Sequence, residues 1–564
     1  MIVLVVNLWR RLVNSWRHLW RRRVDFVRVT LRGGIAEFSD ATPRWRRMLT
    51  GEDQSWSVER LRRLFERVQH DPHAQGVILR IDGLHGGWAT LQSVRSEIAF
   101  ARNQGSRVVA HLFTADVAGY YVACACDSIV MPPSALWNVV GVRAEVQFLR
   151  DALARYGIEV EAIAVSPYKA APDTLTRTDF SPESRAQFER MLDARFDELL
   201  SAIAAARALD KASIQGLIDR APLAAPDALA AHLADALCYD DDIDAWLAGD
   251  NADLRVADWA DARHTLRLPP ARFLPRRIGL IRVEGTITRG SNRVLPVPIP
   301  LLGNRSAGSD ALAQAVRQAE RNPRVAAVVV AVNSPGGDAY ASDLMWREIL
   351  RLRRQKPVVV AMGDTAASGG YYLAAPASAI VAQPATLTGS IGVFVMRPVA
   401  AGLLEQYDVH TTVLSRGANS GLLGSLQRPT DGERAALNRL VWTLYDMFRE
   451  RVRSGRDLSD EQLEPLAGGR VWLGTEAHER GLVDGLGGIP EAVAKAQELA
   501  GLPTDRSMPL VALSGGRSSL APLPFPADEP IAMQQAALWL LQPRAWALQS
   551  WAWRGESGIS GSDW

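Results

Sequence analysis

The feature that most constrains how this 564-residue chain can fold is an internal duplication. The segments Thr114–Tyr121 and Thr365–Tyr372 are identical at five of eight positions when they are aligned at an offset of 251 residues. Pro133 matches Pro384 at the same offset. Because chance rarely holds one offset over such a distance, we interpret the chain as two tandem copies of one domain.

Each copy alternates short β-branched runs with stretches of helical periodicity. The run Val328–Val332 is apolar throughout, which is typical of a strand buried on both faces of a parallel sheet. Strands of this kind that alternate with helices predict βαβ units. We therefore expect an α/β fold in which each copy builds its own parallel sheet.

Composition and linker signals divide the chain further. We expect an amphipathic arm rich in Arg and Trp over residues 1–27, a first domain over 28–267, a second domain over 268–500 and a tail over 501–564. The join starts with the proline-containing stretch Leu268–Pro275. The tail is rich in Pro, Ser and Gly and ends in a group of tryptophans, which could bind a membrane surface or pack on the body of the protein.

The arm carries two chemically different faces. Apolar residues such as Leu8, Leu12 and Trp16 recur at three- and four-residue spacing, and arginines flank them. Trp and Arg on one helix suit the surface of an anionic bilayer. Packing on the protein's own body or on another subunit is the alternative. No stretch of the chain reaches the roughly 18 consecutive apolar residues that a spanning helix needs.

Charge and cysteine usage exclude several classes of function. Lys and Arg number 64 against 62 Asp and Glu, which gives no general electrostatic case for nucleic-acid binding. The three cysteines cannot form a disulfide framework, and the nine histidines are scattered rather than grouped in a metal motif. We expect no metal site.

Two motifs in the second copy follow predicted buried strands. Asn333–Gly337 ends in paired glycines, whose backbone N–H groups can hold a developing oxyanion, although a tight turn alone also explains them. Ser368 stands among small residues at the next strand-to-helix turn, where a nucleophile would be exposed. A helix N-cap is the commoner role for such a serine. Val117 takes the equivalent position in the first copy, so the fold does not require serine there.

A serine nucleophile needs a base, and no histidine of this chain stands in a recognisable partner motif. A lysine can serve if burial leaves its amine neutral. Lys169 is a candidate because lysine is scarce in this Arg-rich chain, although a solvated surface lysine is the simpler interpretation. Alignment of the copies places Ala418 opposite Lys169, so one copy would hold the serine and the other the lysine.

These motifs together resemble the signal peptide peptidase A (protease IV) family, in its long form with two fused Clp-protease/crotonase-like domains. The resemblance covers roughly residues 28–500 and rests on Val332–Gly337, Ala367–Tyr372, Leu387–Gly392, Val471–Gly474 with Gly481–Asp484, and Tyr168–Lys169. It implies that Ser368 is the nucleophile and that Lys169 is the general base, brought together across the interface between copies. It further implies that Gly337 and Gly369 supply oxyanion-hole N–H groups and that Ser390 orients Lys169.

The resemblance also implies a substrate class and a setting. The family degrades hydrophobic peptides, in particular cleaved signal peptides, as a homotetramer that uses no metal or cofactor. Its long form usually carries a transmembrane anchor where this chain has the arm, so we expect peripheral attachment to the inner membrane, on either the cytoplasmic or the periplasmic face. A non-catalytic membrane scaffold and a crotonase-type acyl-CoA enzyme are the alternatives, and the latter would leave Ser368 and Lys169 unexplained.

Overall fold

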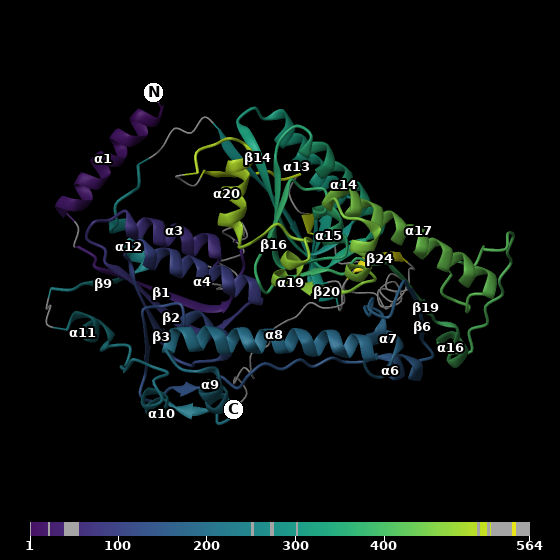
Figure 1. Cartoon of the computed structure of the whole chain (residues 1–564), viewed down its shortest axis with the longest axis horizontal. Helices are drawn as coiled ribbons and strands as arrows, with labels where there is room; N and C mark the ends of the chain where they lie inside the picture. Colours follow the sequence, from purple (N-terminus) through teal and green to yellow (C-terminus); the bar gives the residue numbers. More distant parts are fainter. Residues whose placement is uncertain are drawn as a thin grey trace. The chain divides into compact units, whose positions relative to one another are not determined.

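The computed structural model describes most of the chain (Figure 1). The described residues are 2–20, 23–38, 56–249, 253–270, 276–299, 303–422, 424–504, 508–515, 519–520 and 544–548. They divide into two compact units. Unit 1 contains Met1–Arg143 and Leu192–Phe273, and unit 2 contains Ala144–Met191 and Leu274–Ala552. The segment that carries Lys169 thus belongs to the same unit as Ser368. This differs from the sequence-based boundaries, which placed Lys169 in the first domain over 28–267 and the pair at an interface between the copies.

Unit 1 is built on a six-stranded sheet with the strand order β8-β4-β3-β2-β1-β9. Every pairing in this sheet is parallel, as the βαβ pattern predicts. The strands are β1 (Phe26–Gly34), β2 (Gly76–His85), β3 (Arg107–Leu112), β4 (Ser128–Met131), β8 (Ala236–Leu237) and β9 (Val256–Asp258). A separate antiparallel pair joins β5 (Leu136–Trp137) to β7 (Leu223–Ala224).

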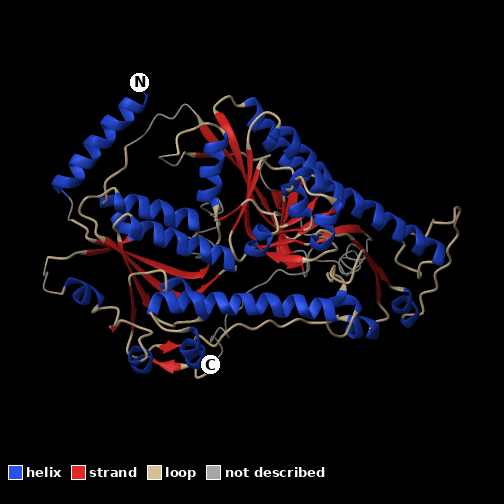
Figure 2. Cartoon of the chain, in the orientation of Figure 1, coloured by secondary structure: helices blue, strands red, loops and turns tan. Residues whose placement is uncertain are grey.

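Helices connect and cover these strands (Figure 2). They are α3 (Val58–Gln69), α4 (Trp88–Asn103), α5 (Val117–Ala123), α9 (Lys211–Ile218), α10 (Ala225–Ala230), α11 (Ile243–Ala248) and α12 (Trp259–Thr265). Helix α3 shows why they form: Ser57 accepts a hydrogen bond from the Arg60 backbone N–H at its start, and the apolar stripe from Leu61 to Val68 is buried.

Unit 2 repeats this succession of elements. Its first sheet has the order β20-β18-β16-β14-β10-β22, with β17 and β21 attached to β16, and only β18 and β20 pair in antiparallel fashion. The strands are β10 (Arg277–Glu284), β14 (Val325–Ser334), β16 (Val358–Ala367), β17 (Ala379–Ala382), β18 (Leu387–Gly389), β20 (Val471–Leu473), β21 (Gly485–Leu486) and β22 (Leu510–Ala512).

The helices of unit 2 continue the correspondence with unit 1. They are α6 (Arg150–Arg155), α7 (Asp173–Thr176), α13 (Ser309–Arg321), α14 (Ala339–Arg353), α15 (Gly369–Ala374), α16 (Ala401–Gln406), α17 (Asp431–Arg456), α18 (Asp460–Leu463), α19 (Gly474–Glu479) and α20 (Ile489–Leu499), with the short 3₁₀ helix η1 (Glu464–Leu466). Helix α8 (Pro182–Arg207) starts in the range of unit 2 and ends in that of unit 1.

A second sheet of unit 2 joins segments that lie far apart in the sequence. Its order is β23-β12-β13-β11-β15-β24-β19-β6. The strands are β6 (Glu159–Ala164), β11 (Thr286–Thr288), β12 (Arg293–Ile299), β13 (Gly303–Gly308), β15 (Gly336–Asp338), β19 (Phe394–Val399), β23 (Ser519–Leu520) and β24 (Arg544–Leu548). This sheet brings the strand before Lys169 beside the strand that follows Ser390.

The predicted arm forms helix α1 (Ile2–Trp20). Arg10 and Arg17 donate hydrogen bonds to backbone carbonyls of the segment Leu266–Pro269. Leu8, Trp9 and Leu12 are exposed to solvent. The polar side of the helix therefore contacts its own unit and apolar side chains face outward. In the described ranges, no helix combines the length and the apolar character needed to cross a membrane.

Candidate active site

Ser368 lies at a strained turn between β16 and α15. Its φ of 53° and ψ of −116° are unusual for a residue other than glycine, and its backbone N–H donates to the Gly389 carbonyl at 2.8 Å. Ser368 holds the N-cap position of α15, yet its side chain makes no capping hydrogen bond. The N-cap interpretation therefore does not account for this serine, and its hydroxyl is directed elsewhere.

The hydroxyl of Ser368 meets Lys169. The Lys169 Nζ lies 2.8 Å from Ser368 Oγ, and it lies 2.9 Å from both the backbone carbonyl oxygen and the side-chain Oγ of Ser390. Lys169 and Ser390 are each 2% exposed, and Ser368 has no exposed surface. The structure thus brings together three of the five residues that the sequence singled out.

Burial determines the protonation state that this geometry favours. Removal of the Lys169 amine from water lowers its pKa well below the ordinary value. A neutral amine has two N–H donors and one lone pair. Its two donors match the two oxygens of Ser390, and its lone pair then faces the hydroxyl hydrogen of Ser368. The arrangement can therefore take a proton from Ser368 Oγ, which is what a general base does.

Ser390 is held by the turn that follows β18. It also has a positive φ, of 50°, and its backbone N–H donates to the Arg470 carbonyl at 2.7 Å. Since both of its oxygens accept from Lys169, Ser390 fixes the direction in which the amine points.

Two glycines that the sequence analysis did not single out seat the backbone of Lys169. A Cβ atom on Gly469 would lie 2.7 Å from both Cα and Cβ of Lys169, and the φ of Gly469 is +88°. The Gly469 N–H donates to the Ile391 carbonyl at 2.8 Å, and Ser166 Oγ donates to the Gly468 carbonyl. Only glycine leaves room for this approach. Only Arg470 separates the pair from the motif Val471–Gly474, and that position was the one available signal.

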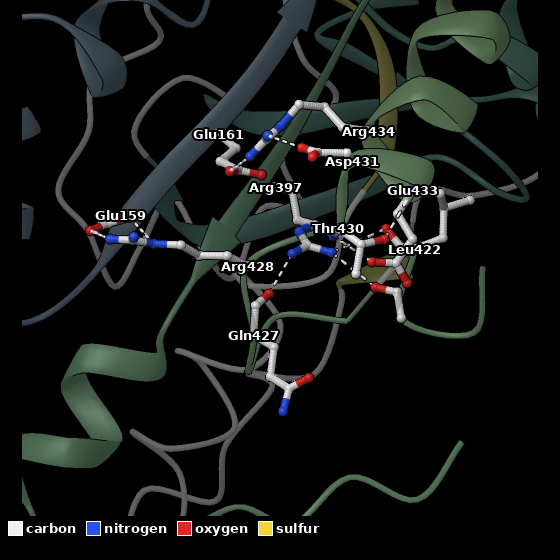
Figure 3. Close-up of polar contacts among 11 residues, drawn as sticks. Glu159, Glu161, Arg397, Leu422, Gln427, Arg428, Thr430, Asp431, Glu433 and Arg434 are labelled. Atoms are coloured by element: carbon white, nitrogen blue, oxygen red, sulfur yellow. Dashed lines mark hydrogen bonds and ion pairs between the residues drawn. The ribbon is translucent and has the colours of Figure 1, made fainter. Parts of the chain in front are cut away.

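The strand before Lys169 is fastened to the second copy. Strand β6 pairs with β19 in antiparallel register from Phe394 opposite Ala164 to Val399 opposite Glu159. Figure 3 shows polar contacts around this pairing, including Arg428 with Glu159 and, at 2.9 Å, Arg434 with Glu161. The backbone ladder and these ion pairs hold the Lys169 segment in unit 2.

Arg397 supports the same region from within. The Arg397 guanidinium, on β19, is buried and donates to backbone carbonyls of Gly421, Leu422 and Gln427 (Figure 3). It ties the segment before α17 to the strand that pairs with β6. No sequence motif indicated this role, because the arginine acts on backbone atoms that lie 24 to 30 residues away.

Gly337 and Gly369 both lie in close contact with neighbouring segments. A Cβ on Gly337 would lie 2.0 Å from the Ile287 carbonyl oxygen, and a Cβ on Gly369 would lie 3.2 Å from the Gly337 nitrogen. The turn that carries Ser368 therefore contacts β15 closely. Backbone N–H groups at such a turn are the elements from which an oxyanion hole can be made.

Comparison with known proteins supplies the class of this site. The profile of peptidase family S49 matches residues 101–255 and 351–503. The chain belongs to peptidase family S49. The chloroplastic serine protease SPPA of Arabidopsis thaliana is 32% identical over 530 residues, which cover 91% of this chain and 76% of that protein. Protease 4 of Haemophilus influenzae is 29% identical over 496 residues, which cover 84% and 78% respectively.

Solved structures are more distant from this S49 peptidase. A ClpP1 mutant from Listeria monocytogenes has 13% identity and a TM-score of 0.24, and the match covers 38% of this chain and 93% of that chain. The predicted resemblance to the protease IV family is confirmed, and so are the α/β fold with parallel sheets and the assignment as a serine peptidase.

Proposed function

We propose that this S49 peptidase hydrolyses hydrophobic peptides, among them cleaved signal peptides, with a Ser368–Lys169 dyad. The observation that supports the dyad most directly is the 2.8 Å separation of Lys169 Nζ and Ser368 Oγ within a buried site. Among the described residues, the hydrogen-bond partners of Lys169 Nζ are Ser368 and Ser390, and neither of them is a carboxylate or a histidine.

The proposed reaction follows from the positions of these atoms. The neutral Lys169 amine takes the hydroxyl proton as Ser368 Oγ attacks the scissile carbonyl carbon. The backbone N–H groups of Gly337 and Gly369 stabilise the oxyanion that forms. The resulting lysine ammonium then gives its proton to the leaving amine, which leaves an acyl-serine. Water hydrolyses this ester with Lys169 again as the base, and the free enzyme returns.

The setting we propose is a membrane surface. Helix α1 presents Leu8, Trp9 and Leu12 to solvent, and an amphipathic helix with exposed Leu and Trp suits the interfacial region of a bilayer. Because Arg10 and Arg17 are bound to carbonyls of their own unit, insertion of apolar side chains would contribute more to binding than attraction to anionic lipid. The expectation from sequence was an anionic membrane surface, to which the arginines that flank the apolar residues would contribute.

Replacement of Ser368 by alanine tests the proposed chemistry. Ser368→Ala should lower kcat for an apolar peptide ester by about three orders of magnitude or more, because no covalent intermediate can form. The matched control is Ser459→Ala: Ser459 caps α18 with its side chain and lies outside the site. That variant should lose about 1 kcal/mol of stability and keep its turnover. Near-normal turnover of Ser368→Ala would refute the assignment.

A further inference from the structure

The second sheet of unit 2 is completed by a strand from the C-terminal tail. Strand β24 lies between β15 and β19 and pairs in antiparallel fashion with both. Gly336, Gly337 and Asp338 stand opposite Leu548, Ala547 and Trp546. On its other side β24 runs along Phe394–Met396, opposite residues 546–544. A segment that follows the second copy by more than 40 residues thus joins the strand that carries Gly337.

The position that β24 fills is a slot for an extended peptide. Strand β15 pairs on its other side with β11, and β19 pairs on its other side with β6, so each contributes one edge to the slot. An extended chain that enters between two edges gains backbone hydrogen bonds on both sides without any demand on its sequence. We refer to the space between β15 and β19 as the peptide slot.

The peptide slot runs directly past the nucleophile. The Gly369 backbone, next to Ser368, approaches β15 so closely that a Cβ there would lie 3.2 Å from Gly336 Cα and Gly337 N. A chain paired with Gly336–Asp338 therefore lies beside the candidate oxyanion donors. A substrate held there would present its backbone to Ser368, and β24 occupies the same edge.

The burial of the dyad agrees with an occupied slot. With β24 in place, Ser368 has no solvent-exposed surface and Lys169 is 2% exposed. A peptide bond must reach Ser368 Oγ for attack, so the described arrangement does not admit a substrate at this edge until a segment leaves. The sequence of β24, Arg-Ala-Trp-Ala-Leu, is mostly apolar, like the substrates proposed above.

We propose that the tail strand Arg544–Leu548 occupies the peptide slot in cis and competes with substrate, so that the peptidase is autoinhibited. This inference rests on the proposed function, because it identifies the slot as the substrate site. A tethered segment is present at a high effective concentration, so even weak pairing keeps the slot filled most of the time. Competition of this kind raises KM and leaves kcat unchanged, since substrate acts only on the open fraction.

A full-length double variant tests the inference. Proline at Ala545 and Ala547 removes two backbone donors from a strand paired on both sides and should expel it from the slot. We expect KM for a short apolar peptide ester to fall by about fivefold or more, with kcat unchanged. The control is Ala536→Pro, which lies in the tail outside the pairing segment and should leave both constants unchanged.

A second variant keeps the test independent of how the prolines affect folding. A recognition sequence for a site-specific protease, inserted within residues 521–543, allows the tail to be cut from protein that has already folded. Cleavage should lower KM as the prolines do. A synthetic peptide of residues 541–551 should then restore the higher KM by competitive inhibition, and a scrambled peptide should not.

The outcomes separate this inference from the proposed function. If intact and cut protein hydrolyse the ester with the same KM, the tail does not compete and the inference is overturned while the peptidase assignment stands. If cutting lowers kcat or abolishes turnover, β24 supports the site rather than blocks it, which also overturns the inference. If neither form nor the Ser368→Ala variant differs from the uncatalysed rate, the proposed function itself fails.

Discussion

The two copies build the same strand-to-helix turn in different ways. In the first copy Asp116 caps α5: it has a φ of −73° and accepts a hydrogen bond from the Gly119 N–H at 2.6 Å. In the second copy Ser368 stands at the start of α15 with a φ of 53° and makes no cap. At the offset of the duplication, Val139 stands where the second copy has Ser390.

This contrast shows what the fold needs and what the chemistry adds. In the first copy a capping side chain stabilises the start of the helix by about 1 kcal/mol. The second copy gives up that cap and holds a serine at positive φ, which costs on the order of 1–3 kcal/mol. The strain directs the Ser368 hydroxyl toward Lys169 instead of toward its own helix. A turn that departs from its stable form in only one of the two copies supports the proposed site in that copy.

The largest effect is expected when the partner of the Ser368 hydroxyl is removed and the turn that carries Ser368 is left unchanged. Lys169→Ala should reduce kcat about 10³-fold or more, because in the proposed dyad Ser368 and Lys169 act as one unit. Lys169→Arg should be equally inactive, since a guanidinium stays protonated. The matched control is Lys356→Ala, which removes a lysine that donates to the Ala319 and Asn322 carbonyls away from the site. Steady-state kinetics of the purified variants provide the measurement, and activity in Lys169→Arg would contradict the role of base.

The pH dependence of activity tests whether Lys169 acts as a neutral base toward Ser368. Burial lowers the pKa of the Lys169 amine, and only the neutral amine can accept the Ser368 proton. The rate should therefore rise with pH through an apparent pKa well below the ordinary 10.5. Because the unfolded chain binds this proton more tightly than the folded one, the same shift costs stability below pH 10.5, and Lys169→Met should raise the melting temperature at neutral pH.

A profile of kcat/KM that rises only near the ordinary lysine pKa of 10.5 would contradict a base whose pKa is lowered by burial. A lower melting temperature for Lys169→Met would show that the amine contributes more by its hydrogen bonds than it costs by burial.

A smaller effect is expected from a substitution at Gly469, which packs against the backbone of Lys169. Gly469→Ala would place a methyl group 2.7 Å from Lys169 Cα, so the lysine must move and kcat should fall about 10- to 100-fold. Gly417→Ala is the matched control: its φ of +92° is nearly that of Gly469, at +88°, and nothing lies within 4 Å of the added atom. Both variants carry similar backbone strain, so equal losses of activity would exclude a specific role for Gly469.

The smallest effect is expected in the first copy. Asp116→Ala should lower the free energy of unfolding by about 1 kcal/mol through loss of the cap and leave kcat unchanged. Asp116→Ser keeps a capping oxygen and should recover most of that stability. Chemical denaturation with parallel activity assays distinguishes the two. A loss of turnover in Asp116→Ala would show that the first copy's turn influences the reaction.

Most of the residues that the sequence identified stand in local motifs. Ser368 and Gly337 follow β-branched strands in short glycine-containing patterns, and the offset of 251 residues made Val117 a meaningful exception. Lys169 emerged from the scarcity of lysine together with the family resemblance. The α/β fold was predictable for the same reason, because strand and helix periodicity are local properties.

What could not be predicted depends on contacts between distant segments. Gly469 matters because Lys169, 300 residues earlier, packs against it, and Arg397 matters because it binds the backbone of a later segment. The assignment of Ala144–Met191 to unit 2 likewise rests on the pairing of β6 with β19. The sequence of the tail did not predict β24, because the position of this strand depends on its pairing with β15 and β19, which lie far from it in the sequence.

The pairing of β6 with β19 also has a consequence for biosynthesis. A ribosome releases β6 and Lys169 about 230 residues before it releases β19, which at ordinary elongation rates is a delay of roughly 10 to 50 seconds. Until β19 emerges, the Lys169 amine is solvated, protonated and unable to act as a base. The nascent chain therefore remains inert toward itself and its neighbours until β19, which ends at Val399 of the 564 residues, has been synthesised and released.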